Sequence, residues 1–303
     1  MRNEAAALFT GGLIAIMVAA NGMLAARVGL WMSVLIIHVC GLATICLILL
    51  ARRRRFTLRA PGLHWTLYAA GAVGVLTTLL NNLCYEPLGA ALMLALCVVG
   101  QLFCSNLIDH FGWFGMRRYP FRPVKLIGFA GMAGGLALMT ITGMGAQGAS
   151  ALTLGSAVLY AVLALFTGAL LAFTTTVNAA LGKRIGVFPG ALVNYLTGLG
   201  TTLACMLVLG GFSWAGIPGT SPFLFSGGVL GLIIVAITSA ILPRIPVVYV
   251  TVILFTGQIL VGIGIDAVGG VGFTAGKLAG CAVVAAGLLY NMQTDRRAAT
   301  PAG

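Results

Sequence analysis

The chain has 303 residues, of which 60% are hydrophobic and only 7% are charged, and its mean hydropathy is +1.09. A soluble globular domain carries about 25% charged residues, so this composition excludes that class and indicates a membrane protein. The formal net charge of +12 does not indicate a nucleic-acid partner, because the basic residues lie in short stretches between apolar segments.

Apolar segments separated by Gly, Pro or charged residues predict ten membrane-spanning helices in an all-α polytopic protein. The first segment is long enough to remain as a spanning helix, so no removable signal peptide is expected. Breaks between helices are expected at Glu86-Pro87 and Pro189-Gly190, among others. The expected helices lie near residues 5–26, 31–50, 64–84, 89–109, 124–143, 155–181, 189–211, 223–243, 246–265 and 277–293.

Polar residues of the first half of the chain return in the second half after an interval of 157 residues. The repeated pairs are Asn21 and Asn178, Arg27 and Arg184, Gly29 and Gly186, Gln101 and Gln258, and Asp109 and Asp266. The chain has only three Asp residues, so two in register are informative. Lys125-Leu126 returns as Lys277-Leu278 at an interval of 152, which indicates a shorter loop. The sequence therefore predicts two units, residues 1–146 and 147–303.

Five crossings in each unit would make the two units inverted relative to each other in the membrane. The distribution of basic residues tests this arrangement independently. The N-terminus and the even-numbered loops hold 15 of the 17 Lys and Arg residues, and only Arg27 and Lys277 fall on the other face. Cytoplasmic loops carry an excess of Lys and Arg, so both termini are expected in the cytoplasm.

Two motifs resemble the YdcZ-like branch of the drug/metabolite transporter superfamily. They are the segment from Gly100 to Gly112, which includes Gln101 and Asp109, and the opening pattern Asn21-x-x-Leu24-x-x-Arg27-x-Gly29. The second copy departs from the first motif, with Ala267 for His110 and Val268 for Phe111. The resemblance implies a secondary carrier of small molecules in a bacterial inner membrane, built here as the fused form of two five-helix units.

Four amides inside predicted helices are candidates for lining a substrate cavity: Asn21, Asn178, Gln101 and Gln258. An amide facing lipid is costly, so these side chains should face protein or a cavity. An amide offers donors and an acceptor that can orient a polar substrate. The alternative is a hydrogen bond between helices that only holds the bundle together.

Four charged residues are candidates for gating or coupling, because inversion places them in pairs on the same face. Arg27 and Asp266 should lie at the external face, and Arg184 and Asp109 at the cytoplasmic face. Two ion pairs that form and break in turn would act as alternating gates. Alternatively, the Arg side chains reach the lipid headgroups and the Asp side chains are solvated.

The sequence thus favours a secondary transporter, in the first place an exporter of small polar metabolites or drugs. A flippase for lipids or lipid-linked substrates and a non-transporting structural or assembly subunit remain alternatives. The sequence contains no nucleophile with a nearby base, no metal-ligand motif and no phosphate-binding loop, so neither an enzyme nor a cofactor is expected. The expected partners are a small-molecule substrate, membrane lipid, and a coupling proton or counter-substrate, and a homodimer is left open.

Overall fold

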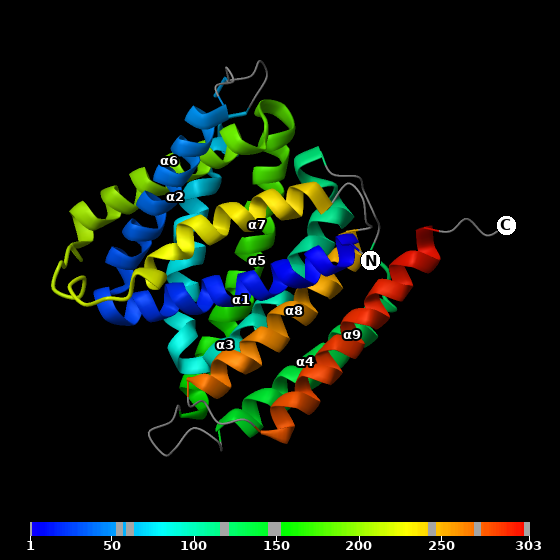
Figure 1. Cartoon of the computed structure of the whole chain (residues 1–303). Helices are drawn as coiled ribbons and strands as arrows, with labels where there is room; N and C mark the ends of the chain where they lie inside the picture. Colours follow the sequence, from blue (N-terminus) through cyan, green and yellow to red (C-terminus); the bar gives the residue numbers. More distant parts are fainter. Residues whose placement is uncertain are drawn as a thin grey trace.

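The computed structural model describes residues 2–52, 57–58, 64–115, 121–144, 153–241, 247–269 and 274–299. Within these ranges all regular secondary structure is helical, and Figure 1 shows long helices that cross one another in a single bundle. Seven helical segments are long and apolar enough to span a membrane, and two shorter apolar helices accompany them. The prediction of an all-α polytopic membrane protein is confirmed.

Each predicted segment overlaps a helix, and two of them, 64–84 and 89–109, overlap the same helix, α3 Ala70–Phe111. Short 3-10 turns precede α3 at Trp65–Ala69 and α7 at Pro222–Ser226, and another follows α3 at Trp113–Gly115. The described α-helices are α1 Arg2–Val28, α2 Leu30–Arg52, α3 Ala70–Phe111, α4 Lys125–Met144, α5 Leu154–Ile185, α6 Val187–Leu209, α7 Gly227–Ile241, α8 Val247–Val268 and α9 Ala275–Ala299.

The junction between α1 and α2 is a single glycine, and the same junction recurs between α5 and α6. Gly29 and Gly186 have φ values of 87° and 98°, a region that glycine enters easily because it has no Cβ. They are one of the pairs repeated at the constant interval, so both halves turn in the same way. The break predicted at Pro189 lies instead at Gly186, because Pro189 fits the first turn of α6, where its missing N–H is not needed.

Helix α3 is a hairpin of two helical arms joined at Gly89, which has a non-helical φ of 73° and ψ of 167°. The Cys97 Sγ atom lies 3.7 Å from Asn81 Oδ1. In a continuous helix two residues 16 positions apart would lie about 24 Å apart, so the chain must fold back between them. The turn predicted at Glu86-Pro87 lies at Gly89 instead, because the proline ring holds φ near −65° and cannot supply the positive angle.

The two halves of the chain meet where α1 crosses α8 and where α5 crosses the second arm of α3, residues 90–111 (Figure 1). Backbones touch directly at both crossings, because a Cβ on any of four glycines would overlap a carbonyl group of the other helix. The four glycine–carbonyl contacts are Gly11 with Leu254, Gly257 with Leu8, Gly168 with Cys97, and Gly100 with Leu165. The last two are the repeat equivalents of the first two, at the same interval as the polar pairs.

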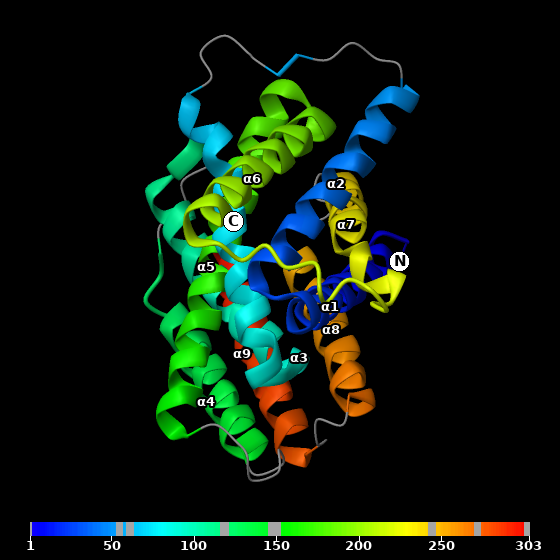
Figure 2. The same cartoon turned by 90° about the vertical axis from the view of Figure 1, so that its left-hand side faces the viewer.

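Helices α4 and α9 also pack side by side through glycine (Figures 1 and 2). A Cβ on Gly128 would lie 2.7 Å from the carbonyl oxygen of Gly287, and a Cβ on Gly287 would lie 2.6 Å from that of Gly128. Gly135 and Gly280 face each other in the same reciprocal way, at 2.7 and 2.6 Å. Small residues thus allow close approach at this interface too.

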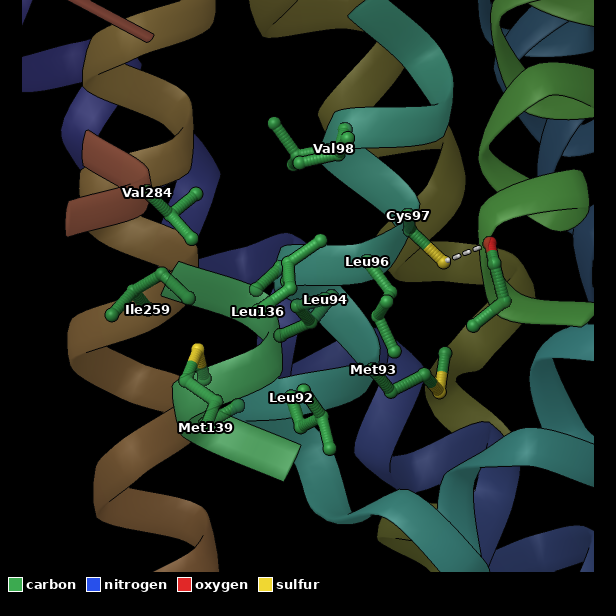
Figure 3. Close-up of a cluster of buried hydrophobic side chains, with 14 of the residues drawn as sticks. Leu92, Met93, Leu94, Leu96, Cys97, Val98, Leu136, Met139, Ile259 and Val284 are labelled. Carbon is green, nitrogen blue, oxygen red and sulfur yellow. Dashed lines mark hydrogen bonds between the residues drawn. The ribbon is translucent and has the colours of Figure 1, made fainter. Parts of the chain in front are cut away.

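The second arm of α3 forms the centre of the bundle, and residues 90–100 of it are all buried. Figure 3 shows its side chains against Leu136 and Met139 of α4, Ile259 of α8 and Val284 of α9. On the opposite side the Cys97 thiol donates to the carbonyl of Ala164 in α5, at 3.4 Å. The hairpin of the first half is therefore packed against helices from both halves.

We predict that Gly257→Ala destabilises the protein by about 1–3 kcal/mol, because the new methyl group would overlap the Leu8 carbonyl and push α1 from α8. Gly264→Ala in the same helix is the matched control. Apart from the adjoining backbone of α8 itself, no described atom lies within 4 Å of a Cβ at position 264, so this change should be neutral or slightly stabilising. Thermal unfolding in detergent measures both, and equal melting temperatures would contradict the close crossing.

Candidate functional site

The two glutamines predicted to line a cavity lie at the crossings of the two halves. Gln258 follows Gly257 in α8 and is buried, and Gln101 follows Gly100 in α3 and is half-buried. Because each preceding glycine touches the backbone of the crossing helix, each glutamine is the residue next to a contact between the halves. A movement of one half against the other would therefore displace the backbone that carries each glutamine.

The two asparagines lie further along the crossing helices. Asn21 follows Leu8 in α1 by 13 positions, and Asn178 follows Leu165 in α5 by the same 13 positions. That separation is about 20 Å of helix. The structure therefore does not bring all four predicted cavity residues to one place, and their role in a common cavity stays a prediction.

Asn21 packs against a helix of the other half. Its side chain is buried, and its Oδ1 atom touches the position that a Cβ on Gly227 of α7 would occupy. The Oδ1 atoms of Asn21 and Asn178 accept no hydrogen bond from any residue that the structure describes. Close packing of this buried oxygen on Gly227 favours an interhelical role for Asn21 in this conformation.

Asp266 binds the start of the second arm of α3, at the tip of the hairpin. Its Oδ1 accepts the N–H of Ala90 at 2.6 Å, and its Oδ2 accepts the N–H of Ala91 at 3.1 Å. The first N–H groups of a helix have no partner within the helix and attract negative charge. Asp266, on the second half, therefore caps a helix of the first half.

Gly89 makes room for this cap. A Cβ at position 89 would lie only 3.1 Å from Oδ1 and 3.2 Å from Oδ2 of Asp266. The glycine thus provides both the positive φ of the turn and the space that the carboxylate occupies.

Lys277 places a second charge beside Asp266. Its side chain is 4% exposed, and its charge acts on the Asp266 carboxylate although the described side chains of the two residues form no ion pair. The Nζ atom of Lys277 is buried and has no hydrogen-bond partner in the part of the chain that the structure describes. Tyr85 and Cys281 also lie within electrostatic range of Asp266.

The equivalent lysine of the first half, Lys125, does have a hydrogen-bond partner. Lys125 is also buried, and its Nζ donates to Asn106 Oδ1 at 2.6 Å. The repeat interval assigns Ile263 to the position equivalent to Asn106, and Ile263 has no acceptor. The two halves therefore share the Asp and Lys residues but differ in what the lysine can bind.

The predicted gating arginines are both exposed, Arg27 at the end of α1 and Arg184 at the end of α5. Within the described ranges there is no ion pair between Arg27 and Asp266, whose carboxylate is held by Ala90 and Ala91. Asp109 is half-buried near the end of α3. An ion pair between Arg27 and Asp266 would thus require another conformation.

A contact that the sequence analysis did not identify joins His38 and Tyr195. Their rings meet edge to face with centroids 6.1 Å apart, and each ring fills the space left by a glycine of the other helix. The repeat interval also separates His38 from Tyr195, so these are equivalent positions of α2 and α6. The constant interval was the available signal, but the two side chains are chemically different and do not resemble a repeat.

No group of three metal-binding side chains gathers anywhere in the described ranges. The site that the structure builds is a polar one in an apolar bundle. Its polar groups lie at separate places: a carboxylate bound to a helix start with an ammonium in its vicinity, and two glutamines next to the helix crossings. Such groups can bind and orient a polar molecule.

Comparisons with known proteins support the architecture. A family model described as "Putative inner membrane exporter, YdcZ" matches residues 5–138 and again residues 159–290. A solved structure titled "Crystal structure of protein" aligns over 98% of each chain with a TM-score of 0.60 and 14% sequence identity, which shows a shared fold. A search of curated proteins finds no match.

Proposed function

The chain belongs to the YdcZ family of inner membrane exporters, as two copies of the family unit in tandem, and we propose that it is a secondary transporter. It exports small polar metabolites or drugs across the inner membrane. The observation that carries this proposal is that the two copies meet through equivalent glycine crossings, with buried polar groups beside them. Two equivalent units facing each other around polar groups can expose a binding site first to one face and then to the other.

The transporter crosses the membrane ten times in this proposal. Seven segments are spanning candidates, but the one at Trp65–Phe111 has 47 residues, about 70 Å of helix, which is twice the thickness of the hydrocarbon layer. Dividing it at Gly89 gives eight crossings. The shorter apolar helices Pro222–Thr238 and Ile253–Val268 make ten.

The ten crossings form two inverted five-helix repeats, residues 1–146 and 147–303. Helix bounds support this division, because the repeat interval that relates the polar pairs also relates both bounds of α2 to those of α6, and the start of α3 to the start of α7. Five crossings per repeat give opposite orientations. The two termini then lie in the cytoplasm, in agreement with the 15 basic residues on that face.

Transport proceeds by movement of one repeat against the other. Gln101, Gln258, Asn21 and Asn178 provide polar surface to the substrate path, at different depths along it. Arg27 with Asp266 and Arg184 with Asp109 act as alternating gates at the external and cytoplasmic faces. A coupling proton or a counter-substrate supplies the driving force.

We predict that the loop after α6 is external and that the segment after α2 is cytoplasmic. Ser213 and Thr57 are both exposed, so single cysteines at these positions in a cysteine-free background are matched probes. A membrane-impermeant thiol reagent should label Ser213→Cys in intact cells and should label Thr57→Cys only after the cells are opened. The reverse pattern would exclude the proposed orientation.

We predict that cells overproducing the protein release more of at least one small polar metabolite, measured by mass spectrometry of the medium. The double variant Gln101→Leu and Gln258→Leu should lose most of this release while it remains folded, because the shape of the side chains is roughly kept and their hydrogen-bonding groups are lost. Leu260→Gln, an exposed position in α8, is a control for added polarity. Unchanged release from the double variant would show that the amides serve helix packing and do not contact the exported metabolite.

Once the exported metabolite is known, the external gate can be tested by charge reversal, and we predict two outcomes. Arg27→Asp should reduce export several-fold, because it places a second negative charge on the face where Asp266 lies. Adding Asp266→Arg should restore part of the export if the two side chains pair in one state of the cycle. Export that is no higher in the double variant than in Asp266→Arg alone would remove the ion pair from the mechanism.

A further inference from the structure

We propose that Lys277 and the N–H groups of Ala90 and Ala91 form a carboxylate-binding site. Asp266 occupies the two N–H groups in this structure, and the carboxylate of a transported metabolite displaces it from them and also reaches Lys277. The inference rests on the proposed transport function and deepens it by naming a substrate class. The substrates are small metabolites that carry a carboxylate, and zwitterions fit best.

The site already holds a carboxylate in this structure. The two oxygens of Asp266 accept the N–H groups of Ala90 and Ala91, one each, at 2.6 and 3.1 Å. Two adjacent N–H groups at a helix start are a binding arrangement for anions in general, since backbone donors and the helix dipole act together. Where helices are interrupted in transporters, such helix starts bind the anionic groups of substrates.

Lys277 is the independent indication that a further ligand belongs here. Its ammonium group is buried, with no hydrogen-bond partner among the described residues. A buried ammonium without an acceptor is destabilising by several kcal/mol in general, so proteins seldom keep one without a use. The carboxylate of a ligand would give it the missing acceptor.

The free ammonium results from one difference between the halves. In the first half Asn106 Oδ1 accepts from Lys125 at 2.6 Å, while the position equivalent to Asn106 in the second half is Ile263. Lys277 therefore keeps its donor capacity, and Lys125 does not. This places the proposed site at the Asp266 end of the bundle.

The charges around the site favour a zwitterion over a simple anion. When a ligand carboxylate takes the N–H groups and Lys277, the Asp266 carboxylate is displaced and needs a cation. An ammonium group on the ligand supplies it, which leaves the site with as many positive as negative charges. Among the described residues, Tyr85 of α3 and Cys281 of α9 also interact electrostatically with Asp266, and both are neutral in their ordinary forms. Helix α1 carries Arg2, Glu4 and Arg27 near its two ends.

Displacement of Asp266 would also couple binding to movement. Asp266 belongs to α8 of the second half, and Ala90 and Ala91 belong to the hairpin of the first half. A ligand that takes over the N–H groups removes a direct link between the halves. Binding thereby frees the hairpin tip to separate from α8.

The test measures ligand-dependent thermal stabilisation of the purified full-length protein in detergent. The probes are acetate and glycine, and the controls at equal concentration are chloride and acetamide. Acetate and glycine at about ten times their dissociation constant should raise the melting temperature by a few degrees, and the controls should not. Lys277→Met should abolish this shift, whereas Lys125→Met should retain it because Lys125 is bound to Asn106.

Two further variants separate binding from general loss of stability. Asp266→Asn weakens the internal competitor, so acetate should bind on the order of tenfold tighter than to the native protein. Ile263→Asn gives Lys277 an acceptor and should weaken the response to acetate without removing either charge. The proposal fails if Lys277→Met keeps the full shift, or if folded Asp266→Asn and the native protein show no acetate or glycine response. Because the assay needs no transport, binding without export would count against the proposed function alone, and export without binding against this inference alone.

Discussion

Direct backbone contact at paired glycines, where the first helix of each half crosses the fourth helix of the other, determines how the rest of this protein is arranged. In lipid there is no hydrophobic force that drives one apolar helix onto another, so association depends on close packing and on polar contacts. Gly11, Gly257, Gly168 and Gly100 remove the side chains that would keep the helices apart. Since both crossings join different halves, neither half is a separate body, and the hairpin of α3 is enclosed between helices from both.

The contacts between the halves are of two chemical kinds, and they differ in how easily they change. The glycine crossings are close-packed, and such contacts shift only as whole helices move. The link between Asp266 and the N–H groups of Ala90 and Ala91 is polar and exchangeable, because another oxyanion can satisfy the same donors. A carrier needs both kinds: a fixed crossing around which the halves can rock, and an exchangeable link that decides when they do.

The sequence predicted the repeat, the helical class and the approximate helix bounds, because polar residues at a constant interval and long apolar segments are linear signals. It did not predict the partners of Asp266. Those partners are backbone N–H groups of Ala90 and Ala91, and no side-chain pattern marks them. The hairpin turn was expected at Pro87 because proline often ends helices, but the positive φ could only fall on Gly89. The repeat interval also relates His38 to Tyr195, but their side chains differ chemically, so the sequence did not mark them as a pair in contact.

An inverted repeat with two identical halves would have inward-facing and outward-facing states of equal energy. In the proposed transporter, the differences between the halves would therefore make one of the two states more populated than the other, with or without a bound ligand. Most differences in this chain exchange one apolar residue for another, but Asn106 and Ile263 differ in whether a buried lysine has an acceptor. Lys125 is satisfied inside its own half, and Lys277 has no hydrogen-bond partner among the described residues. In the proposed transporter, a ligand that supplies the acceptor for Lys277 would stabilise one end of the bundle more than the other and so shift the populations of the two states, while the coupling gradient would set the direction of transport.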